Sequence, residues 1–136
     1  VRWVDDGQAL SSSEAARWMD VTFSNYQKYG YGMFAVEENS GAKTIGFGGL
    51  IHPKGQVDAE VKYAFLPEVW NDGCATEFVR GLLEWAKYAH GLARAIATVA
   101  PENLASQRVL VKSGFRHSET RIESDETRTE VFEVQL

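Results

Sequence analysis

The chain has 136 residues, a formal net charge of −5, and contents of 44% hydrophobic and 24% charged residues. This length and composition predict one globular domain with its own hydrophobic core. The acidic balance argues against broad nucleic-acid binding, which needs a basic face to neutralise phosphates. No apolar run approaches the roughly 18 residues of a membrane-spanning helix. The single cysteine, Cys74, argues against a disulfide framework and favours a reducing, cytoplasmic setting.

The first half of the chain predicts one helix followed by an antiparallel meander. Ser11 and Glu14 form a capping box, and apolar residues then recur at helical spacing to about residue 28. Turn residues then separate three predicted strands, at 33–36, 43–52 and 57–65. The glycines of the middle strand weaken its strand propensity, so they predict a bulge or a close backbone approach.

The second half predicts helices alternating with strands. An apolar stripe predicts a helix over 76–89, and the continuous apolar run 93–100 is typical of a buried parallel strand. Asn103 is a good cap for a short helix over 104–112, and two strands complete the chain, at 115–122 and 130–135. The order α-β-β-β-α-β-α-β-β predicts an α/β (α+β) domain, a mixed sheet with helices packed on it.

The stretch between the third strand and the next helix predicts an anion site. An alternating strand ends at Phe65 and leads through a loop of small residues into the helix. Free backbone amides and the positive end of the helix dipole meet at such a junction. We therefore expect this loop to hold the pyrophosphate of a cofactor.

Three segments then carry a family resemblance. They are the loop WNDGCATE at 70–77, the run Asn103-Leu104-Ala105-Ser106 followed by KSGF at 112–115, and the early strands at 31–36 and 44–50. In this order and spacing they resemble the GNAT superfamily of acyl-CoA-dependent N-acyltransferases. The likeness is greatest to the branch that acetylates ribosomal-protein N-termini and includes small-amine acetyltransferases.

The resemblance covers nearly the whole chain and implies a GNAT-like, mostly antiparallel sheet with acetyl-CoA as co-substrate and no metal. The superfamily's opening strand has no counterpart before Val1. The expectation is therefore a single domain, 1–136, truncated at its N-terminus. One sheet edge would then be exposed or covered by another chain, for example in a homodimer.

The resemblance also implies cofactor-binding residues. The backbone amides of Gly73, Cys74, Ala75 and Thr76 would bind the pyrophosphate, while Asn71 and Asp72 would shape the turn. The strand end at Phe65 and Leu66 would pair with the pantetheine amides, and one N–H there would stabilise the thioester oxygen. Asn103 and Ser106 would contact the pantetheine arm. Trp70 departs from the usual arginine or glutamine at the start of the loop.

The predicted catalytic residues are Glu60 and Ser106. An amine acceptor must lose a proton, so Glu60 is the first candidate for the general base and His52 the second. Many superfamily members place a thiolate-protonating tyrosine where this chain has Leu110. Ser106 is therefore the nearest candidate acid, and Tyr63 is another possible donor. Glu60 as a solvated strand carboxylate and Ser106 as a plain helix residue are the competing interpretations.

The predicted function is transfer of an acetyl group from acetyl-CoA to a primary amine by direct attack in a ternary complex. The acceptor would be a protein N-terminus or a small molecule, which the sequence does not identify. The alternative is a GNAT-like domain that binds acyl-CoA without turning it over, as a sensor or remnant, an interpretation that Leu110 and the missing opening strand support. Neither interpretation involves a nucleic acid or a membrane.

Overall fold

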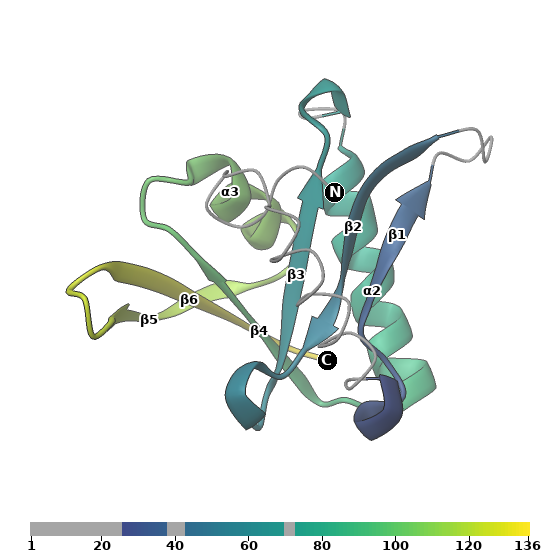
Figure 1. Ribbon diagram of the computed structural model, residues 1–136, viewed down its shortest axis with the longest axis horizontal. Helices are drawn as coiled ribbons and strands as arrows, with labels where there is room; N and C mark the ends of the chain where they lie inside the picture. Colours follow the sequence, from purple (N-terminus) through teal and green to yellow (C-terminus); the bar gives the residue numbers. More distant parts are fainter. Residues whose placement is uncertain (1–25, 38–42, 70–72) are drawn as a thin grey trace.

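The computed structural model describes residues 26–37, 43–69 and 73–136. They form one six-stranded sheet in the order β1-β2-β3-β4-β6-β5, with helices packed against it (Figure 1). Apart from two short 3₁₀ turns, the elements are β1 (Met33–Glu37), β2 (Thr44–Ile51), β3 (Ala59–Phe65), α2 (Cys74–His90), β4 (Arg94–Val99), α3 (Leu104–Lys112), β5 (Arg116–Ile122) and β6 (Arg128–Gln135). Neighbouring strands are antiparallel except β3 and β4, which are parallel.

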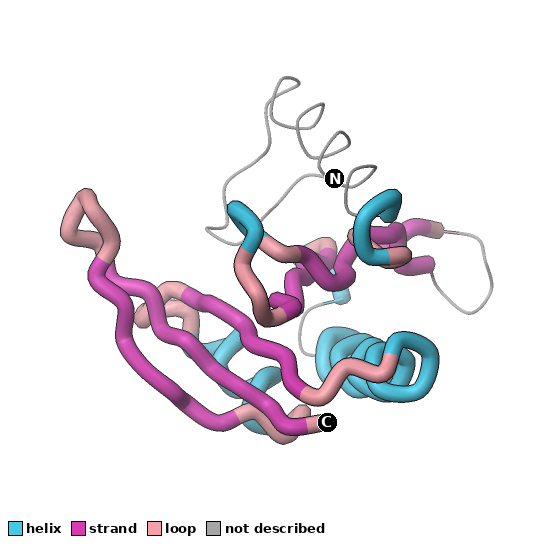
Figure 2. Tube along the Cα trace, turned by 90° about the horizontal axis from the view of Figure 1, so that it is seen from below, coloured by secondary structure: helices cyan, strands magenta, loops and turns pink. Residues whose placement is uncertain are grey.

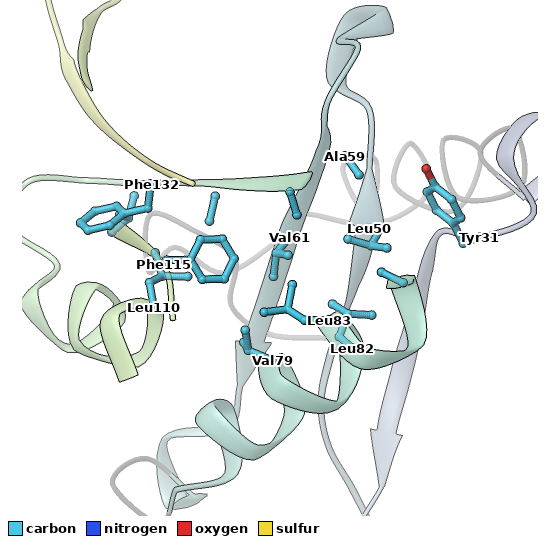
Figure 3. Close-up of a cluster of buried hydrophobic side chains, with 14 residues drawn as sticks. Tyr31, Leu50, Ala59, Val61, Val79, Leu82, Leu83, Leu110, Phe115 and Phe132 are labelled. Atoms are coloured by element: carbon cyan, nitrogen blue, oxygen red, sulfur yellow. The ribbon is translucent and has the colours of Figure 1, made fainter. Parts of the chain in front are cut away.

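Helices α2 and α3 lie on the same face of the sheet (Figure 2). Their apolar side chains meet every second residue of β3 and β4, because alternate strand side chains point to one face. The resulting core is drawn in Figure 3 and includes Leu50, Val61, Val79, Leu82, Leu83, Leu110, Phe115 and Phe132. This packing fixes the two helices beside the region where β3 and β4 separate.

Glycine in β2 lets α2 approach the sheet closely. A Cβ atom at Gly48 would lie 2.5 Å from the Phe78 ring and 2.8 Å from the carbonyl oxygen of Lys62. Real side chains do not tolerate such contacts, so the position requires glycine. The predicted close approach at this strand is confirmed.

β3 and β4 diverge after their first residues. Their parallel register consists of Ala59 opposite Ala95 and Glu60 opposite Ile96. Beyond Glu60, β3 continues beside β2 and β4 continues beside β6, and Figure 1 shows the two strands spreading apart. The sheet therefore opens into a wedge between its two halves.

The predicted order of elements is confirmed for the described residues. Most of the predicted helix ending near residue 28 and the turn at 38–41 lie outside them, although residues 26–29 are helical and Gly30 follows with φ 80°. The continuous apolar strand β4 is parallel to β3 as predicted, but its longer pairing is antiparallel, with β6. Within the described residues no helix has the length and apolar character to cross a membrane.

Candidate active site

A cavity of about 640 Å³ fills the wedge between β3 and β4. Its walls are the second half of β3, the end of β4, the first turn of α2 and one side of α3. It brings together many of the residues predicted from the sequence: Phe65, Gly73, Cys74, Ala75, Thr76, Asn103 and Ser106. A volume of this size is typical of cofactor and ligand sites.

The first turn of α2 points its backbone amides toward one end of this cavity. Gly73 is the N-cap, with φ 79°, and the first intrahelical bond runs from Glu77 N to Gly73 O at 3.0 Å. The amides at 74–76 precede that bond, so the helix offers them to an external acceptor. Together with the helix dipole they suit a phosphate. Trp70, Asn71 and Asp72 lie outside the described residues.

The peptide groups at the end of β3 point in two different directions. The Leu66 N–H donates to Ile45 O at 2.8 Å, and the Leu66 carbonyl accepts from Val69 N at 3.0 Å. Peptide groups alternate in direction along a strand, so those of Tyr63 and Phe65 point to the cavity side. The geometry therefore favours Phe65 over Leu66 as the residue that faces a bound pantetheine arm.

Two hydroxyl groups meet inside the cavity. Tyr63 on β3 reaches across to α3, where its hydroxyl oxygen lies 2.8 Å from Ser106 Oγ. Asn103 fixes the position of Ser106 because its Oδ1 accepts from the Ser106 amide at 3.1 Å. Leu110, by contrast, is 1% exposed and packed in the core. Tyr63, the other possible donor predicted from the sequence, therefore lines the cleft.

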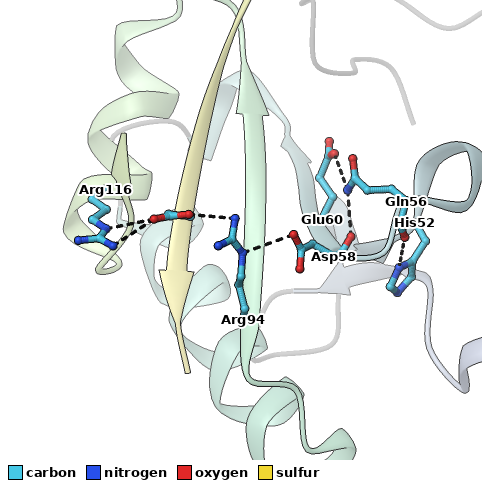
Figure 4. Close-up of polar contacts among 7 residues, drawn as sticks. His52, Gln56, Asp58, Glu60, Arg94 and Arg116 are labelled. Atoms are coloured by element: carbon cyan, nitrogen blue, oxygen red, sulfur yellow. Dashed lines mark hydrogen bonds and ion pairs between the residues drawn. The ribbon is translucent and has the colours of Figure 1, made fainter. Parts of the chain in front are cut away.

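Glu60 lies on the opposite face of β3, at the last pair before the strands diverge. Its side chain is 4% exposed. One carboxylate oxygen accepts from Thr98 Oγ1 at 2.8 Å and pairs with Lys62 Nζ at 3.0 Å. The other oxygen accepts from Gln56 Nε2 at 3.4 Å. Figure 4 shows the contact with Gln56. Glu60 is therefore a buried, partnered carboxylate, not a solvated one.

His52, the second predicted base, is held by its own partners. Its Nδ1 lies 2.9 Å from the carbonyl oxygen of Gln56, which can only accept, so Nδ1 carries the proton. Its Nε2 then accepts from the Tyr31 hydroxyl at 2.6 Å, and Tyr29 stacks on the ring at 3.9 Å between centroids. Burial raises the pKa of the Tyr31 phenol, which keeps it a donor. The position of His52 therefore favours a structural role.

A row of charges continues across the same sheet face. Glu133 on β6 pairs with Arg116 at 3.1 Å and with Arg94 at 2.9 Å, and Arg94 in turn pairs with Asp58 at 3.4 Å (Figure 4). These contacts link β5, β6, β4 and the residue just before β3. They brace the strands on either side of the point where the cleft opens.

Sequence reasoning missed Lys62 and Thr98 as partners of Glu60. The spacing of Glu60 and Lys62 was a usable signal, because residues i and i+2 of a strand share a face. Thr98 gave no such signal, since its contact depends on how β4 pairs with β3.

Comparison with known proteins identifies the family. A profile described as "Acetyltransferase (GNAT) domain" matches residues 1–116. The chain is 38% identical over 73 residues to "Uncharacterized N-acetyltransferase YoaA" of Bacillus subtilis, an alignment that spans 54% of this chain and 40% of that relative.

Solved structures show the same fold. An acetyltransferase from Agrobacterium tumefaciens superposes with a TM-score of 0.84 at 19% identity, covering 97% of this chain and 77% of that one. A spermidine N-acetyltransferase SpeG mutant from Vibrio cholerae superposes with a TM-score of 0.74 at 17% identity, covering 95% and 78%. The chain belongs to the GNAT acetyltransferase family.

Proposed function

We propose that this chain transfers an acetyl group from acetyl-CoA to a primary amine by direct attack in a ternary complex. The observation that carries the proposal is the wedge between β3 and β4. The first turn of α2 offers its free amides at one end of this wedge, and Lys62, whose Nζ contacts the buried Glu60 carboxylate, lines its wall. Family membership and the SpeG neighbours, named as spermidine N-acetyltransferases, support an amine acceptor.

The cofactor would lie along the wedge. The amides at 74–76 would bind the pyrophosphate, and the peptide groups of Phe65 and Tyr63 would face the pantetheine arm, with Asn103 beside it. In this arrangement the thioester would lie near the point where the strands separate. A backbone N–H of β3 directed at the thioester oxygen would stabilise the charge that develops there, a contribution of roughly 3–4 kcal/mol for one oriented donor.

Glu60 and Ser106 would handle the two protons. Glu60 would accept a proton from the incoming ammonium before the neutral amine attacks, since a lysine-like amine has a pKa of about 10.4 and is mostly charged at pH 7. Ser106 donates to the departing thiolate, and the Tyr63 hydroxyl at 2.8 Å is the source that replenishes it. In this proposal Glu60 acts on the attacking amine, and the hydroxyl pair acts on the departing thiolate.

One observation favours the second candidate, an acyl-CoA-binding domain without turnover. Leu110 stands where many superfamily members have the acid tyrosine, and it is fully packed in the core. In that case the wedge would still bind acetyl-CoA, but no amine would be acetylated.

Two measurements test the proposal. Thermal unfolding with acetyl-CoA should show stabilisation of about 4 kcal/mol at a concentration 1,000 times the Kd. The absence of any shift would refute both candidates. Release of CoA thiol with a panel of amines, compared between wild type and Glu60→Gln, then separates them. Turnover that disappears in Glu60→Gln supports acetyl transfer, and binding without thiol release supports the non-catalytic domain.

A further inference from the structure

Glu60 and Lys62 already form the pair that an acceptor amine and a general base would form. Lys62 Nζ lies 3.0 Å from Glu60 Oε2, and the two side chains are only 12% and 4% exposed. Thr98 Oγ1 joins both groups, at 3.2 Å from Nζ and 2.8 Å from Oε2. A primary amine and a carboxylate are therefore held in contact, largely shielded from water.

This pair stands at the wall of the cofactor wedge. Lys62 and Thr98 both line the cavity, together with Tyr63 and Ala64. Lys62 comes two residues after the last residue of β3 that pairs with β4. Continuing that register would set Lys62 opposite Thr98, and their side chains do meet there although the backbones have begun to separate. The amine thus lies where the cleft begins.

We propose that Lys62 is itself an acyl acceptor, so that the chain acetylates its own Lys62 Nζ. The inference rests on the proposed function, since the acetyl donor is the acetyl-CoA bound in the wedge. Glu60 takes one proton from the ammonium, and the neutral Nζ attacks the thioester carbonyl carbon. An N–C bond forms and the C–S bond breaks. The CoA thiolate takes a proton from the hydroxyl pair of Ser106 and Tyr63, and the second proton of the nitrogen passes through water to restore the hydroxyl.

Two features of the site would favour Lys62 over an exposed lysine as the acceptor. Its base is already in hydrogen-bond contact, so the proton transfer needs no diffusional encounter. Its amine also lines the wedge in which the proposed donor would lie, which would raise the effective concentration of the two reactants. Solvent-exposed lysines such as Lys43, whose side chain is 46% exposed, have neither a buried base nor a bound donor.

Acetylation would also change the site. The product amide carries no charge, so Glu60 loses its ion pair and keeps Thr98 and Gln56 as partners. A buried carboxylate without its counter-charge is costly. The modified chain should therefore be less stable than the unmodified one, which provides a readout separate from turnover.

The test is to incubate the purified chain with acetyl-CoA in the absence of any amine and to follow acetylation by intact mass and peptide mapping. We expect one acetyl group at Lys62, added faster than at Lys43. Excess CoA, which carries no acetyl group, should block labelling of Lys62 and leave Lys43 unaffected. Acetic anhydride, which needs no binding site, should show the reverse preference, with Lys43 modified first.

Two variants test the chemistry. Glu60→Gln should slow labelling of Lys62 by roughly 10²–10⁴-fold, the usual contribution of a general base, and leave Lys43 unchanged. Lys62→Arg should abolish the fast label. Circular dichroism establishes that each variant is folded, and the CoA competition needs no variant at all.

The outcomes separate this inference from the proposed function. If acetyl-CoA stabilises the chain and free amines are acetylated while Lys62 stays unmodified, the inference is overturned and the proposed function stands. The inference is also overturned if Lys62 is acetylated no faster than Lys43. The same holds if Glu60→Gln or excess CoA leaves the rate of Lys62 acetylation unchanged, because the label is then adventitious. If acetyl-CoA causes no thermal shift and no acetyl transfer occurs anywhere, the proposed function fails and the inference fails with it.

Discussion

Replacing Lys62 by methionine should destabilise the chain strongly. The substitution keeps most of the side-chain volume but leaves the Glu60 carboxylate, 4% exposed, without its counter-charge at 3.0 Å. Removing one partner of a buried ion pair costs about 3–5 kcal/mol. Because Thr98 still donates to Glu60, we expect the lower end, about 3 kcal/mol.

The double variant Glu60→Met/Lys62→Met should recover most of that loss. Glu60→Met alone should cost less, about 2 kcal/mol, because the longer Lys62 side chain, 12% exposed, can turn its ammonium toward water. Replacing both charges by apolar groups of similar volume is often nearly neutral, so we expect the double variant within about 1 kcal/mol of wild type. The two single costs would then exceed the double cost by about 4 kcal/mol, which is the coupling energy.

Urea unfolding followed by circular dichroism measures these differences. With a slope of about 1–3 kcal/mol per molar urea, the Lys62→Met loss should move the midpoint by roughly 1 M or more. The exposed pair of Lys43 and Glu68, with side chains 46% and 52% exposed, is the matched control, and its coupling should stay below about 1 kcal/mol. Strict additivity of the Glu60 and Lys62 substitutions would refute the argument, because it would mean that the buried pair does not interact.

Three further predictions concern the anion site, the hydroxyl pair and Tyr31. Gly73→Asp should abolish stabilisation by acetyl-CoA, whereas Gly73→Asn should largely retain it. Both residues tolerate φ 79°, but only Asp repels phosphate. Equal binding by the two variants would show that the anion site is elsewhere. Tyr63→Phe and Ser106→Ala should each lower kcat roughly 10–100-fold at unchanged acetyl-CoA affinity, and the double variant should be no slower than Ser106→Ala if the hydroxyls act as one unit. The raised pKa of Tyr31 favours the folded state while the phenol is protonated, so stability should fall as pH rises beyond 10.0; Tyr31→Phe should weaken that dependence in alkaline unfolding curves.

Much of the fold could be predicted from local patterns. The helix at 104–112 was predicted with the bounds that the structure shows, because Asn103 caps it and Ser113-Gly114 follows it. The alternating strand that ends at Phe65 was also predicted, and Val61 and Phe65 of β3 are both buried. These signals lie within a few residues of one another, so they do not depend on tertiary pairing.

The environment of the candidate base could not be predicted in this way. The contact of Glu60 with Thr98 joins residues 38 positions apart, and it exists because β3 and β4 pair briefly before they separate. The same holds for the hydroxyl contact between Tyr63 and Ser106, 43 positions apart. No periodicity in a single sequence reports where two parallel strands diverge.

That divergence also explains how one short strand can serve both ends of the proposed reaction. Successive side chains of β3 point to opposite faces, so Glu60 and Lys62 lie on one side of the sheet and Tyr63 on the other. In a continuous sheet the backbone of β4 would separate the two groups. Because β4 withdraws after Glu60, Lys62 and Tyr63 line the same cavity, and Glu60 contacts Lys62. The amine would therefore approach the thioester from the carboxylate face, and the thiolate would leave toward the hydroxyl face.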